Sequence, residues 1–174
     1  MEPSPGRKGT NKANLQSTDH WFQSAVRYLA RFDRTTTQVE QFLIAKGASL
    51  VQARRTVERL IELRYIDDRA YAERWLESRL ARLPVGPERL RAELFGKGLS
   101  EAVVDEAIRA RLADIDEDTL ARRALQITQR RGRRLSLLQA SRLLHRWGFA
   151  EDTITRIIRG YHEGTFATNE QDRQ

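Results

Sequence analysis

The sequence predicts an all-α protein, built as an array of three tandem three-helix repeats with about nine helices. Three observations predict this class. The 174 residues include only 4 prolines, none of them beyond Pro87, and the chain is rich in Leu, Ala, Arg and Glu, which favour helix. No segment alternates apolar and polar residues over a strand length between turn residues. A glycine motif also recurs about every 50 residues.

The repeat is clearest when the glycines are aligned. Gly47, Gly98 and Gly148 lie 51 and 50 residues apart. A leucine stands four positions before each glycine and an apolar residue directly follows it; these pairs are Leu43 with Ala48, Leu94 with Leu99, and Leu144 with Phe149. A glycine just past a helix adopts positive φ without steric cost, and the resulting Schellman turn brings such a pair into contact. Each glycine therefore predicts a tight turn between two helices.

The first repeat is expected to hold one helix before this hairpin and two within it. The preceding helix runs roughly over residues 20–31, where apolar side chains recur at helical spacing. The next helix is expected to begin at Thr37-x-x-Glu40, interpreted as a capping box. The third begins at Ser49-x-x-Gln52, a second capping box directly after the glycine turn.

The second and third repeats follow the same plan. A helix is expected after Asp67-Asp68, because aspartate favours the N-cap position. Pro84 to Pro87 then interrupts the chain before the next helix, and Ser100 starts the one that follows Gly98. In the third repeat a helix follows Asp116, and Glu151-Asp152 suit the first turn of the last helix.

These elements give the expected domain organisation. We expect three-helix repeats at residues 19–66, 67–115 and 116–163, with a flexible tail at 1–18 and another at 164–174. Repeats of this kind bury their faces mainly against their neighbours, so we expect an elongated, curved array.

Positive charge is concentrated in the last third of the chain. The formal net charge is +7; residues 67–117 carry −3, whereas residues 118–162 carry ten basic and three acidic side chains. This distribution favours a negatively charged partner, either nucleic acid or an acidic protein surface, because arginine offers forked donors to phosphate and carboxylate. The candidate contacts are Arg122, Arg123, Arg130, Arg131, Arg133, Arg134, Arg142, Arg146, Arg156 and Arg159. Two alternatives stay open: genome composition, and arginines that complement helix dipoles.

The sequence offers no catalytic or metal-binding constellation. Cysteine is absent, which excludes disulfides and thiolate chemistry, and the three histidines have no metal-ligand spacing. Gly96-Lys97 lacks the rest of a phosphate-binding loop, and Asp114-x-Asp116-x-Asp118 lacks the glycine and final glutamate of a calcium loop. We therefore expect no enzyme, no cofactor and no metal. No apolar run approaches the ~18 residues of a membrane span, so we expect a cytoplasmic protein with no membrane partner, and a monomer.

The centre of the chain resembles the signature of the RecX family. The matching segments are Tyr65-Ile66-Asp67-Asp68-Arg69-Ala70-Tyr71-Ala72, Gly86-Pro87, Arg89-Leu90-Arg91, Glu93-Leu94 and Lys97-Gly98. Tyr28-Leu29-Ala30-Arg31 and Leu143-Leu144-x-Arg146-Trp147-Gly148-Phe149 resemble the family's first and third repeats. Two departures are Leu83-Pro84-Val85, where the family has a shorter lead into Gly86, and Trp147 before Gly148.

The resemblance implies a regulator that binds filaments of the RecA recombinase on DNA. It implies control, mostly inhibition, of filament growth, RecA ATP hydrolysis and strand exchange, in recombination, DNA repair and the SOS response. Contact with single- or double-stranded DNA would be weak or would run through the filament. The motif residues are expected to be mainly structural; they are Asp67, Asp68, Tyr71, Ala72, Gly86, Glu93, Leu94, Gly98, Gly47 and Gly148. Lys97 is also a candidate contact.

Two other classes of function stay open. Residues 39–63 have the pattern of a helix–turn–helix, so a DNA-binding transcription regulator is possible, with Gln52, Arg54 and Arg55 near the start of its recognition helix. Against this, the equivalent helix of the second repeat starts at Ser100 with several acidic residues, which would repel phosphates. A plain helical scaffold without affinity for nucleic acid would fit the repeats but would leave the basic third repeat unexplained.

Overall fold

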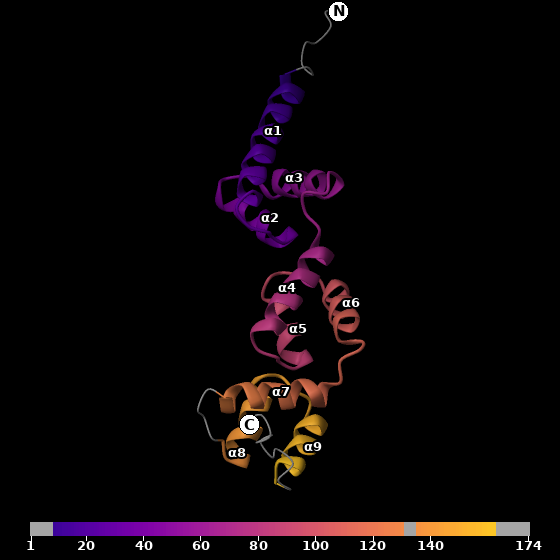
Figure 1. Ribbon diagram of the computed structural model, residues 1–174. Coiled ribbons are helices and arrows are strands. Elements are labelled where there is room, and N and C mark those ends of the chain that lie inside the picture. Colours follow the sequence, from indigo (N-terminus) through magenta and orange to yellow (C-terminus); the bar gives the residue numbers. More distant parts are fainter. Residues whose placement is uncertain (1–8, 131–134, 163–174) are drawn as a thin grey trace, which may run out of the picture. The chain divides into compact units, whose positions relative to one another are not determined.

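The computed structural model describes residues 9–130 and 135–162, and side chains over 19–130 and 135–160. All regular secondary structure in these ranges is helical, which confirms the predicted all-α class (Figure 1). The helices are α1 (Gly9–Leu29), α2 (Thr36–Ala45), α3 (Leu50–Glu62), α4 (Asp68–Arg82), α5 (Pro87–Phe95), α6 (Glu101–Leu112), α7 (Glu117–Arg130), α8 (Leu137–Arg146) and α9 (Glu151–His162). No helix within this described part of the chain is long and apolar enough to cross a membrane.

The chain divides into two compact units. Unit 1 contains residues 1–71 together with the short segment Lys97–Ser100, and unit 2 contains the remainder. In unit 1, α1, α2 and α3 pack around a core that includes Ala25, Val39, Leu43 and Leu60, all fully buried. The placement of Lys97–Ser100 in unit 1 shows that the turn between α5 and α6 packs against the N-terminal helices.

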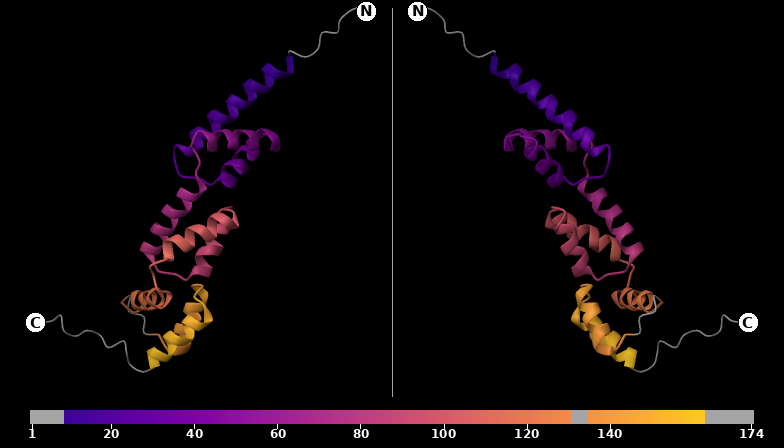
Figure 2. Two further views of the ribbon diagram at one scale, coloured as in Figure 1. Left: turned by 90° about the vertical axis from the view of Figure 1, so that its right-hand side faces the viewer. Right: turned by 90° about the vertical axis from the view of Figure 1, so that its left-hand side faces the viewer.

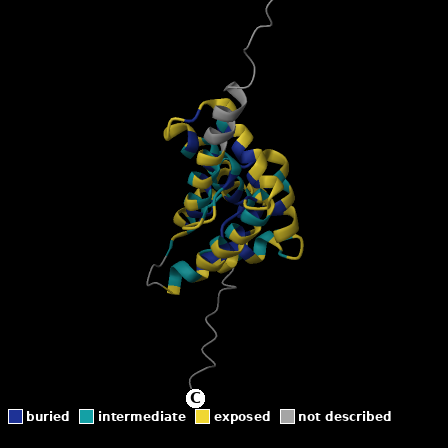
Figure 3. Ribbon diagram, turned by 90° about the horizontal axis from the view of Figure 1, so that it is seen from above, coloured by how far each residue is buried: buried dark blue, intermediate teal, exposed yellow. Residues whose placement is uncertain are grey.

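Unit 2 has a core of its own in the last three helices. Leu125 from α7, Leu144 from α8 and Ile157 from α9 meet there with Phe149, which follows the glycine turn. Helices α8 and α9 lie against each other in both views of Figure 2. Buried and exposed positions alternate along the helices (Figure 3), as expected for amphipathic segments that bury one stripe.

The glycine turns form as predicted. Gly47, Gly98 and Gly148 have φ angles of 101°, 80° and 75°, the left-handed region that disfavours side chains. In the first turn Ala48 N–H donates to the Leu43 carbonyl (3.0 Å), and in the third Phe149 N–H donates to that of Leu144 (3.2 Å). These are the six-to-one bonds of a Schellman turn, and they explain why an apolar pair flanks Gly47 and Gly148.

Two expected helix starts are wrong. Helix α1 begins at Gly9 and so occupies part of the segment expected to be a flexible tail at 1–18, where no proline interrupts the helix. Helix α2 is capped by Thr35 and Gln38 rather than by Thr37 and Glu40. The difference has a physical cause, because the Thr37 hydroxyl donates to a distant carbonyl and Glu40 pairs with Arg54 (3.4 Å).

Several other expectations stay predictions. Residues 1–8 of the first tail and 164–174 of the second lie outside the described residues. The repeat boundaries and the elongated, curved array also remain predictions. The capping box at Ser49 and Gln52 is confirmed.

Candidate partner-binding surface

Helix α7 separates an apolar face from a basic one. Leu120, Ala121, Ala124 and Leu125 are buried on its inner face, at the spacing of successive helical turns. The start of the helix is held by Asp116, whose carboxylate accepts from the Thr119 backbone N–H (3.0 Å) and hydroxyl (3.1 Å). The opposite face is thereby fixed in orientation toward solvent.

An open basic cavity of about 490 Å³ lies on this outer face of α7. The lining residues are Thr119, Arg122, Arg123, Gln126, Ile127 and Arg130. The three guanidinium groups on this face are exposed, and none forms a hydrogen bond or ion pair with another described residue. We call this surface the α7 basic face. It offers charged and neutral donors around one apolar side chain, which is chemistry suited to phosphate or carboxylate groups.

Arg156 is engaged differently from the other candidate arginines. Its Nη2 donates to Asp118 Oδ1 (2.7 Å) and to the Thr153 hydroxyl (3.1 Å), which joins α9 to the first turn of α7. The hydrogen bond from Arg156 is the main cause that lowers the pKa of the Asp118 carboxyl below its usual range. The same pair raises the pKa of Arg156. We therefore assign Arg156 to packing between helices rather than to a free binding surface.

Three other described candidate arginines do not line the α7 cavity. Arg142 and Arg146 lie one turn apart on α8 and Arg159 lies on α9, all exposed and without an ion pair to another described residue. Arg131, Arg133 and Arg134 lie outside the described residues. Of the seven predicted contact arginines within the described residues, the structure brings Arg122, Arg123 and Arg130 together.

The aspartate pair at the start of α4 serves two different helices. Asp67 Oδ1 accepts from the Ala70 N–H (3.0 Å), as expected for an N-cap. Asp68 Oδ1 accepts from the Thr36 N–H (2.9 Å), so this carboxylate satisfies the first turn of α2 instead. Nearby Tyr71 is half-buried, and burial is the main cause that raises the pKa of its hydroxyl.

Glu93 is the centre of an ion-pair network on α4 and α5. Arg79 approaches it from α4 (2.8 Å) and Arg89 from one turn earlier on α5 (2.6 Å). Chiefly through the hydrogen bond from Arg79, the pKa of the Glu93 carboxyl is lowered. The motif residues Ala72 on α4 and Leu94 on α5 are fully buried. These motif positions therefore maintain packing.

The turn containing Gly98 is bound to the start of α2. The Thr35 hydroxyl donates to the Lys97 carbonyl (2.7 Å), and the Thr37 hydroxyl donates to the Gly98 carbonyl (2.7 Å). Thr35 is the N-cap of α2 and Thr37 is its second helical residue, N2. Lys97 thus has a structural role through its backbone, whereas its role as a partner contact stays a prediction.

The turn containing Gly148 is bound to the start of α5 in the same way. The Gly86 N–H donates to the Trp147 carbonyl (2.9 Å), and the Glu88 N–H donates to the Gly148 carbonyl (3.2 Å). Gly86 is the N-cap of α5 and Glu88 is its N2 residue. We call this arrangement a docked turn: two carbonyls of a glycine turn accept from the N-cap and N2 positions of another helix. Among the described residues it occurs twice, once with hydroxyl donors and once with backbone donors.

Sequence reasoning missed the threonine side of the first docked turn. Thr35 is fully buried, and its side chain serves both the α2 cap and the Lys97 carbonyl. The sequence signal for it is the pair Thr35-x-x-Gln38, a capping box two residues before the predicted one at Thr37 and Glu40. A helix pattern alone does not show which of two overlapping boxes forms.

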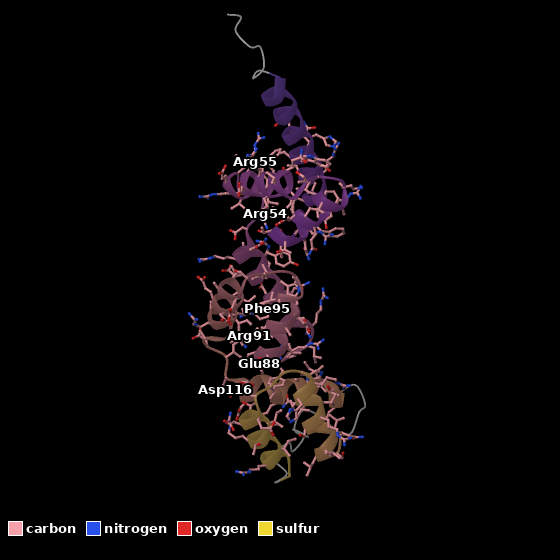
Figure 4. All side chains as sticks on the ribbon, turned by 180° about the vertical axis from the view of Figure 1, so that it is seen from behind. Arg54, Arg55, Glu88, Arg91, Phe95 and Asp116 are labelled. Carbon is pink, nitrogen blue, oxygen red and sulfur yellow. The ribbon has the colours of Figure 1, made fainter. Side chains whose placement is uncertain are left out.

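The helix–turn–helix hypothesis receives little support from α3. Gln52 Oε1 accepts from the Ser49 N–H (2.9 Å), so its side chain closes the capping box instead of facing outward as a base reader. Arg54 and Arg55 are exposed on α3 (Figure 4). On α5, Arg91 pairs with Glu88 (2.7 Å) and with Asp105 (3.1 Å), so its guanidinium group is already engaged within the chain.

Over the described residues, the fold and these surfaces define a class of protein: an all-helical array of hairpins with glycine turns, two of them docked, and a basic helix face. Comparison with known proteins agrees. The family model described as "RecX, second three-helix domain" matches residues 67–108. The Regulatory protein RecX of Mycobacterium sp. (strain JLS) is 34% identical over 138 residues, covering 78% of this chain and 72% of the relative. That of Treponema pallidum (strain Nichols) is 30% identical over 140 residues, covering 80% and 84%. The chain belongs to the RecX family.

Other relatives are covered less completely. The Regulatory protein RecX of Chlorobium phaeobacteroides (strain BS1) is 37% identical over 87 residues, which is 50% of this chain and 58% of the relative. Among solved structures, the crystal structure of RecX from Lactobacillus salivarius matches with a TM-score of 0.70 at 20% identity, covering 86% of this chain and 99% of that one. This likeness shows the shared fold.

Proposed function

We propose that the protein binds RecA–DNA filaments and modulates them without catalysis, mostly by inhibiting filament growth, RecA ATP hydrolysis and strand exchange. Membership of a family whose members are named regulatory proteins supports the regulatory role. The resemblance of the central motif supports RecA as the partner. The cellular context would be recombination, DNA repair and the SOS response in the cytoplasm.

The observation that carries the proposal is the α7 basic face. Arg122, Arg123 and Arg130 stand on one side of a single helix around a cavity of about 490 Å³. A RecA filament combines DNA phosphates with protein carboxylates, and forked guanidinium groups bind both. Direct affinity for single- or double-stranded DNA would be weak, since three phosphate contacts supply only a small part of a specific complex.

The experiment measures RecA ATP hydrolysis on single-stranded DNA while the protein is titrated in. We expect suppression at less than one molecule per RecA protomer, because a filament can be controlled at its growing end or across several protomers. A variant carrying Arg122→Gln, Arg123→Gln and Arg130→Gln should need at least about tenfold more protein, corresponding to ~1.4 kcal/mol of lost binding.

A matched control removes the same charge elsewhere. The variant with Arg142→Gln, Arg146→Gln and Arg159→Gln also lowers the net charge by three, but these residues do not line the α7 cavity. It should retain most of the effect. Equal loss in both variants would show that overall charge, rather than the α7 basic face, directs binding. No suppression by the folded wild-type protein would refute the proposed function itself.

A further inference from the structure

The turn between α2 and α3 has the form of a docked turn but no partner among the described residues. Gly47 has a φ of 101°, and the turn carries the same backbone bonds as the one at Gly148. A Cβ atom added to Gly47 would meet nothing within 4 Å, whereas at Gly98 and Gly148 it would strike another helix. Within the described residues, the carbonyls of Lys46 and Gly47 accept no hydrogen bond.

The start of α8 resembles the helix start of a docked turn, but no glycine turn from the described part of the chain is bound to it. Its N-cap Ser136 forms a capping box with Gln139, as Thr35 does with Gln38 at the start of α2. In α2 the Thr35 oxygen accepts from Gln38, and the hydroxyl hydrogen is donated to the docked turn. Ser136 accepts from Gln139 in the same manner (3.3 Å), but its hydroxyl donates to no described residue. The N–H of the N2 residue Leu138 is one of the free donors of a first helical turn.

Exposed apolar side chains lie beside both of these unused halves. Next to the turn, Val51 is 61% exposed, Leu50 48% and Ile44 43%; at the start of α8, Leu138 is 60% exposed. At the positions of Leu50 and Val51, the other two turns are followed by Glu101-Ala102 and Glu151-Asp152. Acidic residues there favour the helix dipole, so leucine and valine give up that interaction. Exposed apolar groups in this place indicate a contact surface.

We propose that the α2–α3 turn of one molecule docks onto the start of α8 in a second copy of the chain. The Lys46 and Gly47 carbonyls accept from the Ser136 hydroxyl and the Leu138 N–H, and Leu138 packs against Val51. This contact continues, between molecules, the geometry that already occurs twice within the chain. It goes beyond the proposed function and does not depend on it.

The contact joins two different surfaces, so it is head-to-tail and adds molecules in a row. A single turn on one helix end buries little area, and the association is therefore weak, on the order of 100 µM or weaker. At lower concentration the protein is a monomer. Because the chain carries a net charge of +7, screening by salt favours this association and opposes any association through nucleic acid.

The test is sedimentation equilibrium of the full chain, free of nucleic acid, from about 20 µM to about 1 mM at moderate salt. The wild-type weight-average mass should rise above 20.2 kDa with concentration. Val51→Glu blocks the turn and Leu138→Glu blocks the start of α8, so each variant should stay monomeric. Ile61→Glu is the control, because it changes an exposed apolar residue at the far end of α3.

Mixing the two blocked variants gives the sharper result. The Val51→Glu chain keeps its α8 half and the Leu138→Glu chain keeps its turn, so an equal mixture should form pairs, and no larger species. A monomeric wild type over the whole range would overturn the proposal. So would association that both blocked variants retain, or a mixture that does not pair.

Discussion

The Cβ atom that Gly98 lacks would lie 2.5 Å from the Cβ of Thr37, in the contact between the α5–α6 turn and the start of α2. Glycine is therefore required at this position for two separate reasons. It permits a φ of 80°, and it lets the Gly98 carbonyl reach the Thr37 hydroxyl. Gly47 shares the first reason only, since a Cβ there meets open space.

The three turn glycines should consequently differ in their tolerance of alanine. Gly47→Ala should lower the free energy of unfolding by about 1 kcal/mol, the cost of a side chain in the left-handed region. Gly98→Ala should cost about 1–3 kcal/mol more because of overpacking. Gly148→Ala should cost at least as much as Gly98→Ala, since its Cβ would strike the backbone nitrogen of Arg89. Urea unfolding followed by circular dichroism measures all three.

The comparison contains its own control. All three variants add one methyl group at a positive φ, so the differences between them isolate the docking contact. Equal costs at Gly47, Gly98 and Gly148 would show that φ alone determines the effect and that the docked turns contribute little.

Thr35 should be more sensitive to loss of its hydroxyl than an ordinary helix cap. Thr35→Val keeps the shape of the buried side chain but removes the acceptor for Gln38 and the donor to Lys97. We expect a loss of about 2–4 kcal/mol, the sum of a cap and a buried carbonyl left unsatisfied. Ser136→Ala, at an exposed cap, should cost only about 1 kcal/mol.

Thr35→Ser provides the conservative test in the same urea experiment. It keeps the hydroxyl and should retain most of the stability. If Thr35→Ser were as damaging as Thr35→Val, packing of the methyl group, and not hydrogen bonding to Lys97, would explain the sensitivity.

The sequence predicts those structural features that depend on residues close together in the chain. Helical class and the turn at Gly148 follow from propensity and from apolar residues four before and one after the glycine, all within one local motif. The bond from Thr35 to Lys97 joins residues 62 positions apart, and no local pattern specifies it. The structure was also needed to separate the arginines that are exposed and unpaired among the described residues from those that pair with a carboxylate. Arg156 and Arg122 look alike in sequence, yet Arg156 is held by Asp118 across two helices.

The Glu93 network should make stability depend on pH on the acid side. The folded state lowers the pKa of the Glu93 carboxyl, chiefly through Arg79. Such a group binds fewer protons when folded, so its contribution is present above its unfolded pKa, ordinarily 4.5, and is lost as pH falls through the folded value. Glu93→Gln should therefore be less stable than wild type at pH 7, and the difference should shrink toward pH 3.

Unfolding in urea at several pH values checks this dependence. Glu77→Gln is the matched control, because Glu77 is exposed on α4 without an ion pair to another described residue, and it should leave stability nearly unchanged. The free energy of unfolding of Glu93→Gln is compared with that of the wild type at each pH. If the difference stays constant from pH 7 to pH 3, the shape of the Glu93 side chain, and not its charge, stabilises the fold.

The salt dependence of the effect on RecA filaments should separate phosphate contacts from protein contacts. If the α7 basic face binds DNA phosphates, the logarithm of apparent affinity falls linearly with the logarithm of salt concentration, by about 0.7 per contact on single strands. Replacing Arg122, Arg123 and Arg130 by Gln should then reduce this slope by up to about 2. Arg156→Gln is the control, since Asp118 already holds that side chain, and it should leave the slope unchanged. If the triple variant instead weakens binding equally at every salt concentration, no counterions are released at the α7 basic face. This face would then contact protein and not DNA phosphates. Measuring the half-effective concentration at four salt concentrations distinguishes these outcomes.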